Sequence, residues 1–165
     1  MRLTLWTAFW VFLIDQVTKY IVVHWMDLIT RQHIEVWPPF IVFRMAWNRG
    51  VNFGLFAELD MRWVLVALAV AISGVVLYWV RRDGGTRWTY LSAGLLVGGA
   101  AGNVVDRVLY GAVADFLNMS CCGFENPYAF NVADIAVFVG AVGLVIFTGD
   151  GKSKGNGKSR AKKPA

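Results

Sequence analysis

The residues from Trp88 to Leu109 read WTYLSAGLLVGGAAGNVVDRVL, an apolar stretch about as long as the roughly 20 residues that a helix needs to cross a bilayer. Its middle is a run of small residues, Gly98 to Gly102, and its end is polar, with Asn103, Asp106 and Arg107. Small residues in a spanning helix allow neighbouring helices to approach closely. The stretch therefore predicts a tightly packed span that brings a polar turn beside the ends of other spans.

Three further apolar segments approach the same length: roughly Leu3 to Val23, Trp63 to Val80, and Val132 to Thr148. The chain of 165 residues is 57% hydrophobic and has a mean hydropathy of +0.51, whereas soluble domains are about 45–50% apolar. We therefore expect a mainly α fold, a four-transmembrane-helix bundle. A single domain is expected over residues 1–148, followed by a disordered basic tail over residues 149–165.

The basic charge of the chain is concentrated at its end. The formal net charge is +5, but six of the sixteen Lys and Arg residues lie in the last fifteen positions, among Gly and Ser. This composition is typical of a solvated tail beside an anionic membrane surface. No basic stripe with interleaved aromatic residues occurs elsewhere, so no nucleic-acid partner is expected. Cys121 and Cys122 are adjacent and yield neither a disulfide framework nor a CxxC metal pair, so we expect passive loop residues.

Basic residues beside helix ends indicate the cytoplasmic side of a membrane protein. Arg2, the turn from Arg81 to Arg87 and the basic tail all fall on one side of a four-span topology. Both termini are therefore expected in the cytoplasm. The opposite side receives two loops, one from His24 to Met61 and one from about Tyr110 to Asn131.

The first of these outer loops has its own pattern. A β-branched and aromatic run, Phe40 to Phe43, follows Pro38-Pro39 and predicts a short strand or hairpin. The segment around Phe53 to Leu59 is expected to lie in the membrane interface. Trp37 and Trp47 suit the level of the lipid headgroups.

Polar residues from three spans and a loop are predicted at one depth. With a rise of about 1.5 Å per residue, Asp15 and Lys19 lie in the outer half of the first span. The third span ends with its polar turn near the outer face, and Asp134 opens the fourth span from outside. Ionisable groups at membrane depth are costly and mark functional sites. The predicted cluster consists of Asp15, Lys19, Asn103, Asp106, Arg107, Asp115 and Asp134.

Asp115 in VADF and Asp134 in NVADI form the most informative pair of this cluster. Two carboxylates in a poorly hydrated site do not both ionise easily, so one acts as general base on water and the other as general acid. The pair predicts hydrolysis of a peptide bond. Plainer interpretations remain: Asp134 as a residue that favours a helix N-terminus, Asp115 as a turn former, and Asp15 with Lys19 as a structural i,i+4 ion pair.

Two other classes of protein are compatible with buried charges in a membrane. One is a small proton-coupled transporter, in which intramembrane Asp and Lys residues relay ions. The other is a structural subunit whose charges bind partner helices. Transporter sites usually lie near the midplane between repeated halves. Here the polar residues are predicted near the outer face and no internal repeat is visible, so hydrolysis is the favoured interpretation.

Five motifs resemble, in order and spacing, the boxes of the lipoprotein signal peptidase family, also called signal peptidase II. They are DQVTK (Asp15 to Lys19), NRGVNFG (Asn48 to Gly54), GGAAGNVVDR (Gly98 to Arg107), GAVADF (Gly111 to Phe116) and FNVADIAV (Phe130 to Val137). The resemblance runs from about residue 10 to residue 140. The second box departs from the family, which often has Thr and Ala where this chain has Arg49, Val51 and Asn52.

The resemblance implies a multi-pass enzyme of the bacterial cytoplasmic (inner) membrane with its active site near the outer, periplasmic face. It implies a small β-cradle and an interfacial helix in the first outer loop. The activity implied is that of an aspartic endopeptidase, which cuts diacylglyceryl-modified prolipoproteins before the lipidated cysteine and needs no cofactor or metal. We expect a monomer in contact with membrane lipids.

The resemblance also implies roles for single residues. Asp115 and Asp134 correspond to the catalytic pair. Substrate-binding or site-supporting roles fall to Asn48, Asn103, Arg107 and Asn131. A structural polar network is expected from Asp15, Lys19 and Asp106.

Overall fold

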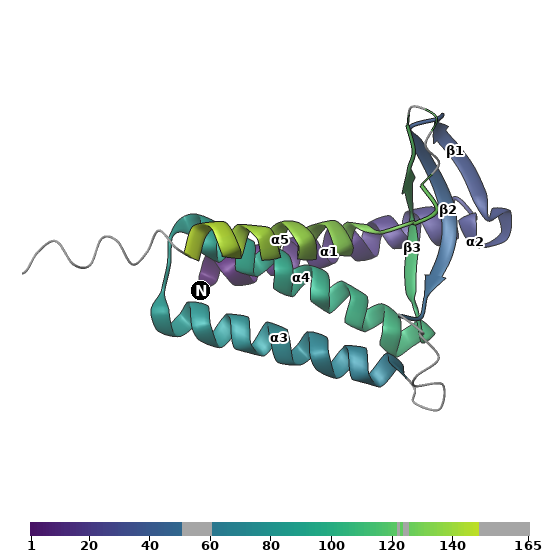
Figure 1. Ribbon diagram of the computed structural model, residues 1–165. Coiled ribbons are helices and arrows are strands. Elements are labelled where there is room, and N and C mark those ends of the chain that lie inside the picture. Colours follow the sequence, from purple (N-terminus) through teal and green to yellow (C-terminus); the bar gives the residue numbers. More distant parts are fainter. Residues whose placement is uncertain (51–60, 122, 124–125, 149–165) are drawn as a thin grey trace, which may run out of the picture.

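The computed structural model describes residues 1–50, 61–121, 123 and 126–148. Within these residues, four long helices run roughly along one direction, and a small antiparallel sheet stands across one end of them (Figure 1). The helices are α1 (Arg2–Lys19), α3 (Met61–Asp83), α4 (Arg87–Tyr110) and α5 (Val132–Thr148). The expectation of a mainly α fold with a small β-element is confirmed.

All four predicted apolar segments form helices. α5 has the predicted bounds, and α3 and α4 extend a little beyond theirs. The first segment does not stop at Val23, because α1 continues into a π-helix, η1 (Tyr20–Trp25). By length and composition, Arg2–Trp25 and Met61–Asp83 are able to cross a membrane, and α5 is a shorter apolar helix. The count of four spans stays a prediction.

Local signals define both ends of α4. Thr86 is the N-cap, and its hydroxyl and that of Thr89 bond reciprocally to each other's backbone N–H in a capping box. At the other end Gly111 adopts the left-handed conformation, with φ of 77°, and its N–H bonds to the carbonyl of Arg107. Glycine is favoured at such a cap because it has no Cβ. These caps place the polar turn of α4 at the end that faces the sheet.

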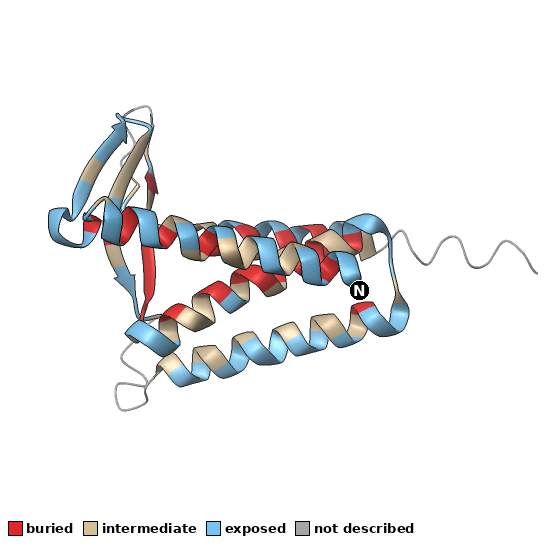
Figure 2. Cartoon of the chain, turned by 180° about the vertical axis from the view of Figure 1, so that it is seen from behind, coloured by how far each residue is buried: buried red, intermediate tan, exposed pale blue. Residues whose placement is uncertain are grey.

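α4 lies between the other helices and packs against α1, α3 and α5. A Cβ atom on Gly98 would lie 2.5 Å from the carbonyl oxygen of Ala8, and one on Gly102 would lie 2.5 Å from Oδ2 of Asp15. Only glycine therefore permits this approach of α4 to α1. Figure 2 shows buried residues along α4 and exposed residues on the outer faces of its neighbours. The predicted tight packing of the small-residue run is confirmed.

The sheet has the order β1 (His33–Trp37), β2 (Ile41–Asn48) and β3 (Val113–Met119), with both pairings antiparallel. β1 and β2 form the hairpin predicted for the first outer loop. The short helix α2 (Leu28–Arg31) leads into it. An apolar core beneath the sheet joins it to the end of η1, through Val22, Val23, Leu28, Met45, Ala114 and Phe116.

The prediction of a loop around Asp115 is wrong, because this residue lies in β3 and pairs with Ala46 of β2. Ala, Asp and Asn are poor strand formers, and three of the first six residues of β3 are of these types. The strand forms because a distant segment, β2, supplies its hydrogen-bond partners. No local pattern reveals such a pairing.

Cys121, expected to be a passive loop residue, is disulfide-bonded. The prediction that the cysteines yield no disulfide is therefore wrong for this residue, since sequence spacing alone does not decide the oxidation state of a thiol. Cys122 lies outside the described residues. The predicted interfacial segment around Phe53 to Leu59 and the predicted tail over residues 149–165 also lie outside them.

Candidate active site

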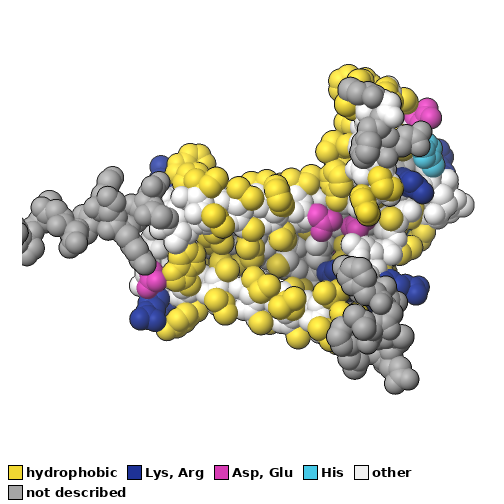
Figure 3. Space-filling model, viewed as in Figure 1, with side chains coloured by type: hydrophobic (Ala, Val, Ile, Leu, Met, Phe, Trp, Pro, Cys, Tyr) yellow, Lys and Arg dark blue, Asp and Glu magenta, His cyan; other side chains and the backbone are white. Residues whose placement is uncertain are grey.

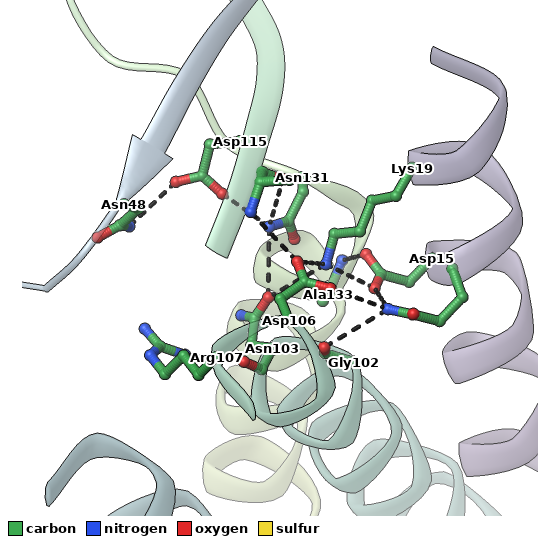
Figure 4. Close-up of polar contacts among 12 residues, drawn as sticks. Asp15, Lys19, Asn48, Gly102, Asn103, Asp106, Arg107, Asp115, Asn131 and Ala133 are labelled. Atoms are coloured by element: carbon green, nitrogen blue, oxygen red, sulfur yellow. Dashed lines mark hydrogen bonds and ion pairs between the residues drawn. The ribbon is translucent and has the colours of Figure 1, made fainter. Parts of the chain in front are cut away.

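The residues predicted for the site meet where the helix bundle joins the sheet (Figure 4). They come from the end of α1, the last turns of α4, the start of α5 and the ends of β2 and β3. In the space-filling view, acidic side chains are visible at this junction, between hydrophobic surfaces (Figure 3). The residues brought together are Asp15, Lys19, Asn48, Asn103, Asp106, Arg107, Asp115, Asn131 and Asp134.

Asp115 is held at both carboxylate oxygens. Nδ2 of Asn48, the last residue of β2, donates to Oδ2 at 3.0 Å, and Nδ2 of Asn131 donates to Oδ1 at 2.7 Å. The residue is 3% exposed. The carboxyl group of Asp115 is therefore fixed in orientation and largely shielded from water.

Asp134 lies in the first turn of α5 and is partly exposed. Its Oδ2 accepts from the backbone N–H of Asn131 at 3.1 Å, while its own N–H donates to Oδ1 of Asn131 at 2.9 Å. This reciprocal pattern is a capping box. Nδ2 of Asn103 donates to the other oxygen, Oδ1, at 2.8 Å. Asp134 thus stabilises the helix start, as the plainer interpretation holds, and is also oriented by α4.

Asn131 joins the two aspartates. Its amide nitrogen binds Asp115, and its amide oxygen and backbone nitrogen bind Asp134. Asn131 is fully buried. A single rigid residue therefore fixes the two carboxyl groups relative to each other, although they come from a strand and a helix.

Burial, and next the negative charge of Asp134, raise the pKa of Asp115 to about 7. Hydrogen bonds from Asn48 and Asn131 and the charge of Lys19 act in the opposite direction but are weaker. Near neutral pH the carboxyl group of Asp115 is therefore still partly protonated. Two carboxyl groups in this state supply an acid and a base at once.

A buried ion network lies behind the pair. Nζ of Lys19 is 2.7 Å from Oδ2 of Asp15 and 2.8 Å from Oδ2 of Asp106. The same Nζ donates to Oδ1 of Asn103 at 3.5 Å. The side chains of Lys19, Asp15 and Asp106 are 7%, 0% and 2% exposed. Asp15 and Lys19 thus form a buried ion pair with Asp106 as a third member, and their structural role stays a prediction.

The two carboxylates of this network hold the backbone next to each predicted catalytic residue. Oδ1 of Asp15 accepts from the N–H of Ala133 at 2.9 Å, one residue before Asp134. Oδ2 of Asp106 accepts from the N–H of Ala114 at 3.2 Å, one residue before Asp115. The network thus ties both aspartates to α1 and α4.

Gln16 is a member of this network that the sequence reasoning missed. Its Nε2 donates to Oδ2 of Asp15 at 3.1 Å and to Oδ1 of Asp106 at 3.2 Å. The position of Gln16 inside DQVTK, between Asp15 and Lys19, was the signal that could have identified it. A polar amide on a partly buried helix face needs partners, and the two carboxylates provide them.

Arg107 has unused hydrogen-bonding capacity. Nη1 donates to the carbonyl oxygen of Asn103 at 3.3 Å. Nε is buried and has no hydrogen-bond partner within the part of the chain that the structure describes. The guanidinium group is attracted by the charges of Asp134 and Asp115. Arg107 therefore lies near both aspartates and has one buried donor, Nε, that no described residue uses.

Within residues 1–50, 61–121, 123 and 126–148, no group of three or more His, Cys, Asp and Glu side chains is arranged to hold a metal ion. The chemistry that the described side chains offer is proton transfer by the paired carboxyl groups, with amide and guanidinium donors around them.

Comparison with known proteins places this geometry in context. A family model described as signal peptidase (SPase) II matches residues 7–148. The chain is 42% identical over 157 residues to the lipoprotein signal peptidase of Methylobacterium sp. (strain 4-46), with 93% of each chain covered. It is 37% identical over 159 residues to the lipoprotein signal peptidase of Alteromonas mediterranea, with 93% of this chain and 85% of the relative covered.

Two solved structures have a similar fold. The fold is similar to a bacterial membrane enzyme determined by the in meso method at 1.9 Å, with a TM-score of 0.75 and 28% identity over 87% of this chain and 90% of that one. A second bacterial membrane enzyme, determined by the same method at 2.3 Å, gives a TM-score of 0.72 at 28% identity, with 97% of this chain and 94% of that chain covered.

Proposed function

The chain belongs to the signal peptidase II family, and we propose that it removes the signal peptide from diacylglyceryl-modified prolipoproteins by aspartic catalysis, cutting before the lipidated cysteine. The observation that supports this proposal most is the link through Asn131, which binds both Asp115 and Asp134. The raised pKa of Asp115 adds to it, because this carboxyl group is then still partly protonated near neutral pH. The comparisons give no support to the transporter alternative.

The reaction needs one water molecule and the two carboxyl groups. In the proposed mechanism the two carboxyl groups share one proton, and burial and the charge of Asp134, which raise the pKa of Asp115, favour Asp115 as its carrier. Asp134 takes a proton from water as the oxygen of that water attacks the scissile carbonyl carbon. Asp115 gives its proton to the amide nitrogen as the C–N bond breaks. The products are the free signal peptide carboxyl group and the new amino terminus on the lipidated cysteine.

The neighbouring donors have separate proposed roles. Asn131 and Asn48 orient Asp115, and Asn103 orients Asp134. Arg107, whose buried Nε lacks a partner among the described residues, donates to the carbonyl oxygen on which negative charge develops. Such fixed donors stabilise the transition state more than the ground state.

The proposed placement in the membrane has four spans, both termini in the cytoplasm and the site near the outer face. The helices expose apolar side chains outwards, for example Trp6, Phe138 and Val145. Lipid-facing surfaces have this character. The chain start and the turn after Arg81 and Arg82 lie at the end of the bundle opposite the sheet (Figure 1). The proposed state of the protein is a monomer.

Asp115→Asn and Asp134→Asn, made separately, test the catalytic assignment. Purified protein in lipid is incubated with a diacylglyceryl-modified precursor peptide, and cleavage before the modified cysteine is followed. Each variant should lose at least a thousandfold in rate while its membrane insertion and unfolding temperature stay near wild type. Asp83→Asn is the matched control, since Asp83 is an exposed aspartate at the far end of α3. Normal cleavage by either site variant would refute the assignment.

A further inference from the structure

The β2–β3 ribbon has two faces, and only one of them presents the catalytic pair. Side chains alternate across a strand, and directly paired residues share a face. Ala46 pairs with Asp115, and the next residue, Trp47, pairs with Ala114. Trp47 and Ala114 therefore lie on the reverse of the face that presents Asp115. The carboxyl group of Asp115 therefore faces away from what lies on this reverse face.

Two adjoining cavities lie on the reverse face. One of about 210 Å³ is lined by Lys19, Tyr20, Trp47, Asp106 and Tyr110, among others. The other, of about 250 Å³, is lined by Trp47, Arg49, Tyr110 and Ala112. Trp47 and Tyr110 line both, and their ring centroids are 5.8 Å apart. The two cavities are therefore neighbours that share an aromatic wall.

The first cavity has the chemistry of a site for a small organic cation. Three aromatic residues, Tyr20, Trp47 and Tyr110, line it together with Asp106, and Gln16 and His24 complete its polar lining. Aromatic rings attract ammonium groups through their negative faces, most strongly where water is excluded. The rings at the rim are exposed, with Tyr20 at 67% and Tyr110 at 54%. The cavity is thus open to a ligand that arrives from outside.

Lys19 does not turn this cavity into an anion site. Its three N–H donors already have three acceptors, on Asp15, Asp106 and Asn103. The buried network contains two carboxylates for one ammonium group. Of these two carboxylates, Asp106 lines the cavity and Asp15 lies behind Lys19. A second ammonium group in the cavity therefore meets the carboxylate of Asp106 and aromatic residues, whereas an anion meets no free donor from Lys19.

The second cavity favours an anion rather than a cation. Arg49 lines it and is exposed at the end of β2. A guanidinium group binds phosphate through paired N–H donors. A ligand that fills both cavities therefore has a phosphate beside Arg49 and an ammonium group beyond the Trp47–Tyr110 wall.

We propose that these two cavities bind the headgroup of a zwitterionic phospholipid, with its phosphate at Arg49 and its ammonium group between Tyr20, Trp47, Tyr110 and Asp106. Phosphatidylethanolamine has this arrangement, because a short carbon link separates its two charges. The cavities lie where the bundle joins the sheet, and Trp and Tyr are favoured at headgroup depth. Val108 and Leu109, 46% and 65% exposed beside Tyr110, provide an apolar surface for the acyl chains.

Native mass spectrometry of the full chain in detergent micelles tests the proposal. Phosphatidylethanolamine should remain bound at least fivefold more than phosphatidylglycerol, which lacks the ammonium group. Arg49→Gln and Tyr110→Leu should each lower the bound fraction of phosphatidylethanolamine at least fivefold. The matched control is Arg44→Gln, because Arg44 is an exposed arginine within β2, close to Arg49 in the sequence, but lines neither cavity.

Three results would overturn the proposal. The first is equal binding of the two lipids, and the second is an equal loss on Arg44→Gln and Arg49→Gln. The third is saturation by soluble glycerophosphoethanolamine at the same concentration as by the lipid, which would assign the site to a small metabolite instead. Circular dichroism of each variant confirms that it is folded. Because the readout is lipid binding, its outcome is independent of the catalytic assignment of Asp115 and Asp134.

Discussion

Nδ2 of Asn131 lies 2.7 Å from Oδ1 of Asp115, and this hydrogen bond joins the start of α5 to β3. The same side chain accepts the N–H of Asp134 through Oδ1 at 2.9 Å. Asn131 therefore has two functions, and each depends on a different side-chain atom. The amide nitrogen orients Asp115, and the amide oxygen caps α5.

Substitution of Asn131 separates these duties. Asn131→Ser keeps an oxygen that can cap α5 but removes the donor to Asp115, so cleavage should fall at least tenfold with little change in stability. Asn131→Ala removes both functions, so it should lose activity and also about 1 kcal/mol of stability through the missing cap. Cleavage rates and unfolding in micelles measure the two effects. Equal stability of the Ser and Ala variants would contradict the capping role.

The pH dependence of cleavage should follow the proton on Asp115. Burial and the charge of Asp134 raise the pKa of Asp115 to about 7. The proposed acid is therefore protonated below that pH and is lost above it. The rate should fall about tenfold per pH unit well above pH 7, in a profile measured on the cleavage of the precursor peptide. A rate that stays constant to pH 9 would contradict this assignment.

Stability should also depend on the protonation of Asp115. Its pKa is raised from the ordinary 3.8 to about 7, so the folded chain binds this proton more tightly than the unfolded chain. The resulting stabilisation is fully present below about pH 4 and is lost as pH rises through 7. Asp115→Asn should therefore flatten the decline of unfolding free energy between pH 4 and 7. An unchanged slope would show that Asp115 titrates normally.

The helices and the site residues were accessible to sequence reasoning for a physical reason. Apolar length defines a helix that can span a membrane, and α5 has the predicted bounds. The polar turn at the end of α4 follows a helical period, so Asn103 and Arg107 share a face without any knowledge of the fold. Charged residues in an apolar surround are also conspicuous, as Asp15 and Lys19 show.

What sequence reasoning missed depends on contacts between distant segments. β3 forms because β2 supplies its partners, and Asp115 was therefore assigned to a loop. Gln16 was overlooked because its position inside DQVTK does not show which residues it binds, and its partner Asp106 lies on a distant segment. The link between Asp115 and Asp134 through Asn131 likewise appears only when a strand and a helix start are placed side by side.

Removal of Lys19 should be costly because it leaves buried carboxylates without a cation. Lys19→Met removes the ammonium group that pairs with the carboxylates of Asp15 and Asp106. Both carboxylates are almost inaccessible to solvent. Loss of one partner of a buried pair costs about 3–5 kcal/mol. Adding Asp106→Asn should restore part of this loss, whereas Arg82→Ala, which breaks an exposed pair with Asp83 at 3.7 Å, should change stability by less than about 0.5 kcal/mol. The free energy of unfolding in micelles is measured for Lys19→Met, for Lys19→Met combined with Asp106→Asn, and for Arg82→Ala.

Gly102→Ala should damage the site from within the bundle. A Cβ atom at position 102 would lie 2.5 Å from Oδ2 of Asp15 and 3.4 Å from Cβ of Ala133. Because the carboxylate of Asp15 is held by Lys19 and by the N–H of Ala133, α4 has to move or these bonds have to break. Overpacking of this kind costs about 1–3 kcal/mol. A shift of Ala133 also moves Asp134, the next residue in the chain. The cleavage rate should therefore fall together with the stability.

The control for Gly102→Ala is the same change at Gly74 in α3. No atom lies within 4 Å of a Cβ at that position, so the substitution meets no obstacle. It should leave cleavage unchanged and raise stability by about 0.5–1 kcal/mol, because alanine favours a helix more than glycine does. Unfolding free energies and cleavage rates of the two variants are compared in the same lipid. If Gly102→Ala behaved like Gly74→Ala, the contact between α4 and Asp15 would not constrain the site.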